Sequence, residues 1–185
     1  PIILAGGPSA WNCEPMAPVF DAVLLGDGEE SIVEVCSCIR DARAEGASRS
    51  QLLCRLAELP GVYVPSLYDV VYDESSTRWG YAVPKPGTPA REVVLKSCIP
   101  DLAATPPVAS TIVPYMGIVQ DRLSLEVLRG CARGCRFCQA GMTYRPVRER
   151  PADQVVAAGE EGLSCSGHDE ISLTSLSTTD HSQCA

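Results

Sequence analysis

The sequence predicts an α/β fold, because short apolar segments alternate with amphipathic helices and glycine-rich turns follow the apolar segments. Residues 1–5 form the first apolar segment, and Gly6-Gly7 ends it. Residues 22–25 form the second, which ends in Gly26-Asp27-Gly28. Apolar strands that alternate with helices are typical of a parallel sheet covered by helices.

The two helices that follow these strands have recognisable starts. Asp27 and Glu30 have capping-box spacing, and the helix after them is expected to turn one apolar stripe inward, formed by Ile32, Val33, Val35, Cys36 and Ile39. Ser48 and Gln51 repeat the spacing before a second helix, whose expected inward residues are Leu52, Leu53, Leu56 and Leu59. A Pro-Gly pair ends this helix. Residues 1–60 are therefore predicted to be one α/β region.

Residues 61–118 have a different character. Short β segments are expected at residues 62–64, 70–72 and 80–83, separated by polar turns. Seven prolines lie between residues 84 and 114. This density excludes a long helix and is typical of an extended connector.

Residues 119–185 return to an α/β pattern. A strand with Leu123, Leu125 and Val127 on one side runs into Arg129-Gly130. A helix is expected from Pro151 to Gly162, with inward residues Val155, Val156 and Ala158, and residues 170–177 form the next strand. The order predicts one strand–loop–helix unit and the start of a second.

Length and composition restrict the class of protein. The chain has 185 residues, and 45% of them are hydrophobic, which allows a buried core. Its net charge of −8 argues against a protein that binds nucleic acid over its whole surface. No apolar run reaches the ~18 residues of a membrane helix, so no membrane partner is expected. The chain lacks an initial Met and begins on what resembles an interior strand. We therefore expect a fragment of a longer protein.

Ten cysteines are present, and seven are scattered. Free cysteine is among the most often buried residue types, so the scattered ones are expected to be buried thiols in a reducing cytoplasm: Cys13, Cys36, Cys38, Cys54, Cys98, Cys165 and Cys184.

The other three cysteines are clustered. Cys131, Cys135 and Cys138 form a Cys-x3-Cys-x2-Cys pattern, which arises by chance about 0.03 times in a chain of this composition. Three soft thiolates on one short loop suit an iron–sulfur cluster. Gly130 and Gly134 allow the loop to fold back toward it. The three cysteines are the predicted ligands of a [4Fe–4S] cluster, with one iron left open.

Other interpretations of the same segment stay open. A non-catalytic iron–sulfur carrier is one, and a zinc-binding module with Cys165 or His168 as fourth ligand is another. The flanking segment also holds six arginines, which are either an anion-binding site or a solvated loop: Arg129, Arg133, Arg136, Arg145, Arg148 and Arg150.

The Cys-x3-Cys-x-Phe-Cys motif at a strand end resembles the radical S-adenosylmethionine (SAM) superfamily. The resemblance implies an enzyme in which the open iron binds the amino and carboxylate groups of SAM. One electron then cleaves SAM to methionine and a 5′-deoxyadenosyl radical, with flavodoxin or ferredoxin as electron donor. It also implies a SAM contact at Phe137. Ser175, Ser177 and Asp180, at the end of the next strand, are expected either to contact SAM or to cap that strand end. The substrate and the catalytic residues stay open.

Residues 129–151 resemble a narrower group, radical SAM proteins with an N-terminal cobalamin-binding-like domain. The two glycine-rich loops of residues 1–60 resemble the last strand–loop units of that domain. The resemblance implies that residues 1–60 end a doubly wound cobalamin-binding-like domain and that residues 119–185 begin a partial βα barrel. It raises cobalamin as a further cofactor, although the Asp-x-His-x-x-Gly motif of some relatives is absent from this chain. A fragment with so little of the barrel is expected to be inactive alone.

Overall fold

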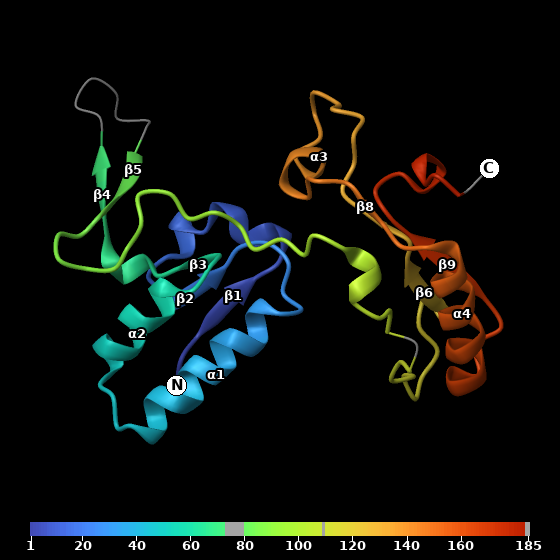
Figure 1. The fold of residues 1–185 in the computed structure, drawn as a ribbon, viewed down its shortest axis with the longest axis horizontal. Coiled ribbons are helices and arrows are strands. Elements are labelled where there is room, and N and C mark those ends of the chain that lie inside the picture. The colour runs from blue at the N-terminus through green and yellow to red at the C-terminus, as the bar shows by residue number, and fades with distance from the viewer. Residues whose placement is uncertain (73–79, 109, 184–185) are drawn as a thin grey trace. The chain divides into compact units, whose positions relative to one another are not determined.

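A mixed α/β fold is confirmed by the computed structural model, which describes residues 1–72, 80–108 and 110–183. The chain divides into two compact units, an N-terminal unit of Pro1–Ile99 and a C-terminal unit of Pro100–Ala185 (Figure 1). The division falls inside the segment predicted as a connector. No helix in the described parts of the chain has the length and apolar character needed to cross a membrane.

A three-stranded sheet organises the N-terminal unit. Its strands are β1 (Leu4–Gly6), β2 (Ala22–Leu24) and β3 (Val62–Tyr63), in that order. β1 and β2 are parallel, as predicted, but β3 is antiparallel to β2. The direction reverses because two helices, rather than one, connect β2 to β3.

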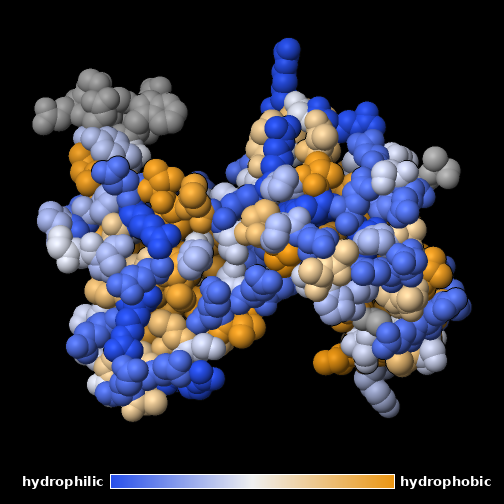
Figure 2. All heavy atoms as spheres, in the orientation of Figure 1, coloured by the Kyte–Doolittle hydropathy of each residue, from blue (hydrophilic) through white to orange (hydrophobic). Residues whose placement is uncertain are grey.

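Those helices are α1 (Ser31–Ala44) and α2 (Arg49–Glu58). They pack on the sheet around a core that includes Ala22, Val35, Leu52, Leu53, Leu56, Val62 and Val64. Figure 2 shows apolar residues gathered where the two helices and the sheet meet. A second cluster contains Ala10, Cys13, Val23, Tyr63 and Tyr68. Leu52, Leu53 and Leu56, predicted as inward residues of α2, are confirmed as core, and Leu59 is partly buried against it.

The predicted helix starts had different outcomes. Before α2, the Ser48 hydroxyl accepts a hydrogen bond from the Gln51 amide (3.3 Å) and the Gln51 side chain accepts one from the Ser48 amide (2.8 Å), so this capping box is confirmed. The predicted Asp27–Glu30 box is wrong. The N-cap of α1 has no side-chain hydrogen bond, and the Asp27 carboxylate instead accepts one from the Ile99 amide at 2.8 Å.

The predicted stripe of α1 is also partly wrong. Val35 is buried and Ile39 packs against the core, but Ile32 and Cys36 are exposed and Val33 is 61% exposed. The narrow sheet covers less of the helix than the periodicity suggested. The expectation of buried thiols likewise fails for Cys36 and Cys165, which are exposed, and Cys184 lies outside the described residues.

The predicted β segments after residue 61 are present. β4 (Tyr68–Tyr72) and β5 (Gly80–Pro84) form an antiparallel pair. Short 3₁₀ turns link the elements of the chain: η1 (Pro8–Asn12), η2 (Glu14–Met16), η3 (Pro65–Leu67), η4 (Leu102–Ala104) and η5 (Thr178–Asp180).

The N-terminal unit is closed by the segment around Ser97, which lies against the loop after β2. The Ser97 amide donates to the Leu25 carbonyl (2.8 Å), and the Ser97 carbonyl accepts from the Asp27 amide (2.9 Å). The Ser31 hydroxyl donates to the Ser97 hydroxyl at 2.6 Å. Gly26 has a φ of +103°, and a Cβ there would lie 2.0 Å from the Ser97 carbonyl oxygen. Only glycine admits this approach.

The C-terminal unit contains the predicted strand–loop–helix–strand order. β6 (Leu123–Glu126) pairs in parallel with β9 (Ile171–Thr174), and α4 (Ala152–Ser166) connects them. β7 (Leu128–Arg129) pairs antiparallel with β8 (Arg148–Glu149), and α3 (Ala140–Thr143) lies between these two strands in the chain. Leu123, Leu125 and Ala158 form the apolar core, with Val155 packed on it. Val156, predicted to point inward, is 60% exposed because a two-stranded sheet covers only one narrow face of α4.

Candidate metal centre

The cysteine loop (residues 130–138) begins directly after β7. Gly130 is buried with a φ of +92°, and a Cβ there would lie 2.7 Å from the Pro146 carbonyl oxygen. The base of the loop therefore packs closely on the segment that returns to β8. Gly134, in the middle of the loop, has a φ of +64°, and the nearest atom to its would-be Cβ is the Arg145 Nη2 at 3.7 Å. The loop is tight at its base and open in its middle.

The three predicted ligand cysteines are free thiols on this loop. Cys135 is exposed, and Cys131 and Cys138 are half-buried. The Cys138 amide donates to the Cys135 carbonyl (3.1 Å), and the Arg133 amide donates to the Cys131 Sγ (3.5 Å). Among the residues the structure describes, no three His, Cys, Asp or Glu side chains are gathered closely enough to hold a metal ion. The loop thus brings the three cysteines together in the chain without converging their sulfur atoms.

The donor set nevertheless fits an iron–sulfur cluster by its chemistry. All three side chains are soft sulfur donors, none is in a disulfide, and each is at least partly exposed. A backbone amide already donates to one of the sulfurs, which is the kind of hydrogen bond that stabilises ligand thiolates.

Two of the six nearby arginines are buried, which the sequence did not reveal. The Arg150 guanidinium donates to the carbonyls of Leu102 (3.0 Å), Thr105 (2.6 Å) and Glu126 (3.2 Å). The Arg148 guanidinium donates to two further carbonyls, those of Pro146 (3.1 Å) and Tyr144 (3.2 Å). These side chains hold the unit together and belong neither to an anion site nor to a solvated loop. The carbonyl partners of Arg150 lie 24 to 48 residues away in the chain, so no local pattern in the sequence indicates its burial. The partners of Arg148 are only two and four residues away, but they follow from the turn before β8, which the sequence analysis did not predict.

The segment after β9 contains the predicted SAM contacts. The hydroxyls of Ser175 and Thr178 share a hydrogen bond of 2.7 Å, and the Ser177 hydroxyl donates to the Asp180 Oδ2 at 2.8 Å. Asp180 also forms a two-point ion pair with Arg133 of the cysteine loop, with 2.7 Å between Arg133 Nε and Asp180 Oδ2. Arg133, and to a lesser degree Ser177, lower the pKa of the Asp180 carboxyl.

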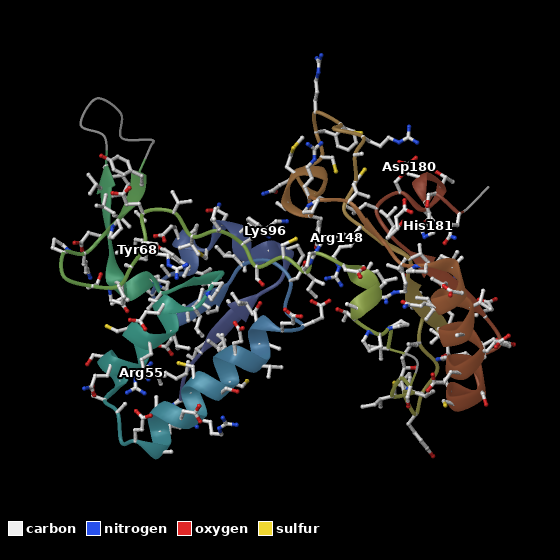
Figure 3. The ribbon with its side chains drawn as sticks, in the orientation of Figure 1. Arg55, Tyr68, Lys96, Arg148, Asp180 and His181 are labelled. Carbon is white, nitrogen blue, oxygen red and sulfur yellow. The ribbon has the colours of Figure 1, made fainter. Side chains whose placement is uncertain are left out.

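The structure therefore brings the cysteine loop and the end of β9 together. In Figure 1 the segment around α3 and the segment around η5 lie at the same end of β6 and β9, and Figure 3 shows Asp180 and His181 on the latter. Phe137 is not part of this cluster of hydrogen bonds and is 91% exposed.

A pocket of about 210 Å³ lies at this end of the parallel strands. Its lining includes Glu126, Leu128, Arg129, Tyr144, Ser175 and Leu176. Of the predicted SAM contacts, only Ser175 lines it. Glu126 and Arg129 form a two-point ion pair (2.8 and 2.7 Å), so the pocket carries both signs of charge. Ligands of parallel sheets commonly bind at the carboxyl ends of the strands.

The fourth zinc ligands that the sequence left open lie elsewhere. Cys165 and His168 precede β9, whereas the cysteine loop follows β6 and β7. Because β6 and β9 are parallel, these residues lie at opposite ends of the strand pair. The His168 Nδ1 is 3.4 Å from the Asp121 carboxylate, and His181 is buried with its Nε2 2.8 Å from the Arg150 carbonyl. The arrangement disfavours the zinc alternative.

The glycine-rich loop after β2 is covered by another segment of the N-terminal unit, which disfavours cobalamin at this loop. The loop after β2 stands at the carboxyl end of a parallel strand pair, where a ligand of a doubly wound fold would bind. The backbone of Ser97 and Ile99 already occupies that position. We derive no step through cobalamin.

Comparison with known proteins gives a family match in the N-terminal part of the chain. Residues 1–65 match the family described as "Radical SAM proteins, N-terminal". This match supports membership of the radical SAM superfamily, on a part of the chain that does not contain the cysteine loop.

One curated relative matches nearly the whole chain. It is an uncharacterized protein of Methanocaldococcus jannaschii, 26% identical over 181 residues, which cover 97% of this chain and 32% of the relative. The chain thus spans about a third of the length of the curated relative it matches. No solved structure matches the chain.

Proposed function

We propose that this chain supplies the cluster- and SAM-binding part of a radical SAM enzyme. The observation that carries the proposal is the three-thiol loop at the carboxyl end of the β6–β9 pair, next to a pocket with both signs of charge. The match of residues 1–65 to the N-terminal family of radical SAM proteins supports it independently.

In this proposal Cys131, Cys135 and Cys138 hold three irons of a [4Fe–4S] cluster, and the fourth iron stays open to a small molecule. When bound, such a cluster supplies the single electron that cleaves SAM to methionine and a 5′-deoxyadenosyl radical. The cysteine loop contributes a backbone hydrogen bond to one ligand sulfur, from the Arg133 amide to Cys131.

The pocket is suited to the methionine part of SAM, which carries an ammonium and a carboxylate. The Glu126 carboxylate can accept hydrogen bonds from the ammonium, and the paired Arg129 guanidinium can donate to the carboxylate. The Ser175 hydroxyl adds a neutral partner, and Leu128 and Leu176 provide apolar surface beside the charges. Ser177 and Phe137 stay as proposed SAM contacts that do not line the pocket.

The remaining parts of the proposal follow from the cofactor. A reduced cluster needs an electron donor, for which a flavodoxin or a ferredoxin is suited, and a reducing compartment such as the cytoplasm. The substrate is not assigned.

The test is anaerobic reconstitution with iron and sulfide, followed by electron paramagnetic resonance (EPR) of the reduced chain. We expect about four irons per chain and a change of the EPR signal on addition of SAM but not of adenosine, which lacks the amino-acid part. The Glu126→Gln variant should keep its iron and need more SAM for the same change. A reconstituted cluster whose EPR signal does not change on addition of SAM would favour a non-catalytic iron–sulfur module.

A further inference from the structure

We propose that Arg133 and Asp180 are a pair of positioning residues that fix the middle of the cysteine loop against the end of β9. In this role they set the arrangement from which the ligand thiols bind a metal. The inference rests on the proposed function only for its consequence for metal binding, because the contacts of the pair itself are between side chains of this chain.

Arg133 lies between two ligands, and it is connected in two directions. Its backbone amide donates to the Cys131 Sγ at 3.5 Å. Its guanidinium donates to both carboxylate oxygens of Asp180, with 2.7 Å between Nε and Oδ2. The planar guanidinium and carboxylate meet at two points, so the contact restricts orientation as well as distance. One residue thus links a ligand sulfur to the segment after β9.

Asp180 is itself held in place. Its Oδ2 also accepts from the Ser177 hydroxyl at 2.8 Å, so both carboxylate oxygens have donors. The side chain of Asp180 is 29% exposed and does not line the pocket beside the loop. Asp180 is therefore placed to act through Arg133, whereas Ser175 is placed to contact a molecule in the pocket.

The middle of the loop has little else to hold it. The residues from Ala132 to Phe137 are exposed, and a Cβ on Gly134 would have a single atom within 4 Å. The base of the loop, by contrast, is packed at Gly130. An exposed ion pair contributes little on average, but a two-point contact between a guanidinium and a carboxylate is among the more effective ones. In the middle of the loop this contact does not compete with close packing at Gly134.

The experiment is a charge-reversal cycle in the full chain. The variants are Arg133→Asp, Asp180→Arg and the double variant that carries both. Arg136→Asp is the matched control, because it makes the same charge change at an exposed position of the same loop. Circular dichroism first shows whether each variant is folded, and the milder set of Arg133→Gln, Asp180→Asn and their double is measured in parallel.

The first measurement is amide hydrogen exchange in the metal-free, reduced chain. We expect peptides from residues 130–138 and 175–183 to exchange about two- to fivefold faster in each single variant, the range that an exposed pair supports. The charge-reversed double variant should return to within about twofold of the wild type, and Arg136→Asp should match the wild type. In the milder set the double variant should exchange no faster than either single one, because the pair is lost only once.

The second measurement is the rate at which a chelator removes iron from the reconstituted chain. We expect each single variant of the pair to lose iron faster than the wild type. The charge-reversed double variant and Arg136→Asp should lose it about as fast as the wild type. Unchanged exchange in both single variants would overturn the inference, as would additive effects in both sets of variants. If the wild-type chain binds no iron, the proposed function fails, while the exchange cycle still decides whether the pair positions the loop.

Discussion

The two units of the chain are held together in different ways. In the N-terminal unit, side chains such as Val23, Leu56 and Val64 are fully buried in apolar clusters on both sides of a sheet. In the C-terminal unit the apolar core is small, and Arg148, Arg150 and His181 are buried beside it with backbone carbonyl partners.

This difference determines which substitutions each unit tolerates. Apolar burial is non-directional, so a core of this kind relaxes partly around a substitution. Hydrogen bonds from a buried guanidinium are directional, and removing the donor leaves one buried carbonyl and several part-buried ones without it. The unit that carries the cysteine loop is therefore the one in which single polar residues matter most.

The cysteines give the largest expected contrast between the units. We expect Cys135→Ala to reduce iron binding after reconstitution to background, because it removes one of three ligands. Cys36→Ala, at an exposed position of α1, should bind as much iron as the wild type. Iron and sulfide analysis of the two variants checks this. A Cys36 variant that loses iron while a Cys135 variant retains it would reverse the assignment of the ligands.

A core substitution should separate stability from metal binding. Leu56 has no exposed surface, and Leu56→Ala should lower the free energy of unfolding of the N-terminal unit by about 2–5 kcal/mol. Hydrogen exchange should rise in α1 and α2, while iron content after reconstitution stays at the wild-type level. Loss of iron in this variant would mean that the two units do not fold independently.

The matching substitution in the C-terminal unit is Arg150→Met, which keeps much of the side-chain volume and removes the donors. We expect a loss of about 2–3 kcal/mol, because the carbonyls of Leu102, Thr105 and Glu126 lose a charged partner. Hydrogen exchange should rise in β6 and α4 and not in α2. If Arg150→Met lowers the free energy of unfolding no more than a surface substitution does, water can replace the guanidinium as hydrogen-bond donor to these carbonyls.

The smallest expected effect concerns the two glycines of the cysteine loop. Gly130→Ala should cost about 1–3 kcal/mol, because its φ is positive and the new Cβ meets carbonyl oxygens of the returning segment. Gly134→Ala has the same backbone strain but no close atom, so it should cost less and retain more iron. Thermal unfolding and iron analysis compare the pair. Equal stability and equal iron content in the two variants would mean that close packing at Gly130 does not contribute to either property.

Local patterns in the sequence predicted local structure well. The Ser48–Gln51 capping box and the strand–helix order around the cysteine loop depend on residues close together in the chain, and both are present. The clustered cysteines were likewise visible from spacing alone, and the loop places them at a strand end as predicted.

Partners far apart in the chain were not predictable in this way. Asp27 has the spacing of a helix cap, yet its carboxylate accepts from Ile99. The ion pair between Asp180 and Arg133, 47 residues apart, was likewise not visible in the sequence. Periodicity also overestimated burial at Val33 and Val156, because it reports a helix face without saying how much sheet covers it. These outcomes depend on tertiary contacts that a single sequence does not encode locally.

The position of Ser97 has a consequence for how the chain is made. During synthesis the loop after β2 leaves the ribosome well before Ser97 does, so the N-terminal unit is not closed until the β4–β5 pair has also emerged. A piece cut at residue 65, where the family match ends, would leave Gly26 and Asp27 without the segment that lies on them. An N-terminal piece intended for separate expression should extend through Ile99.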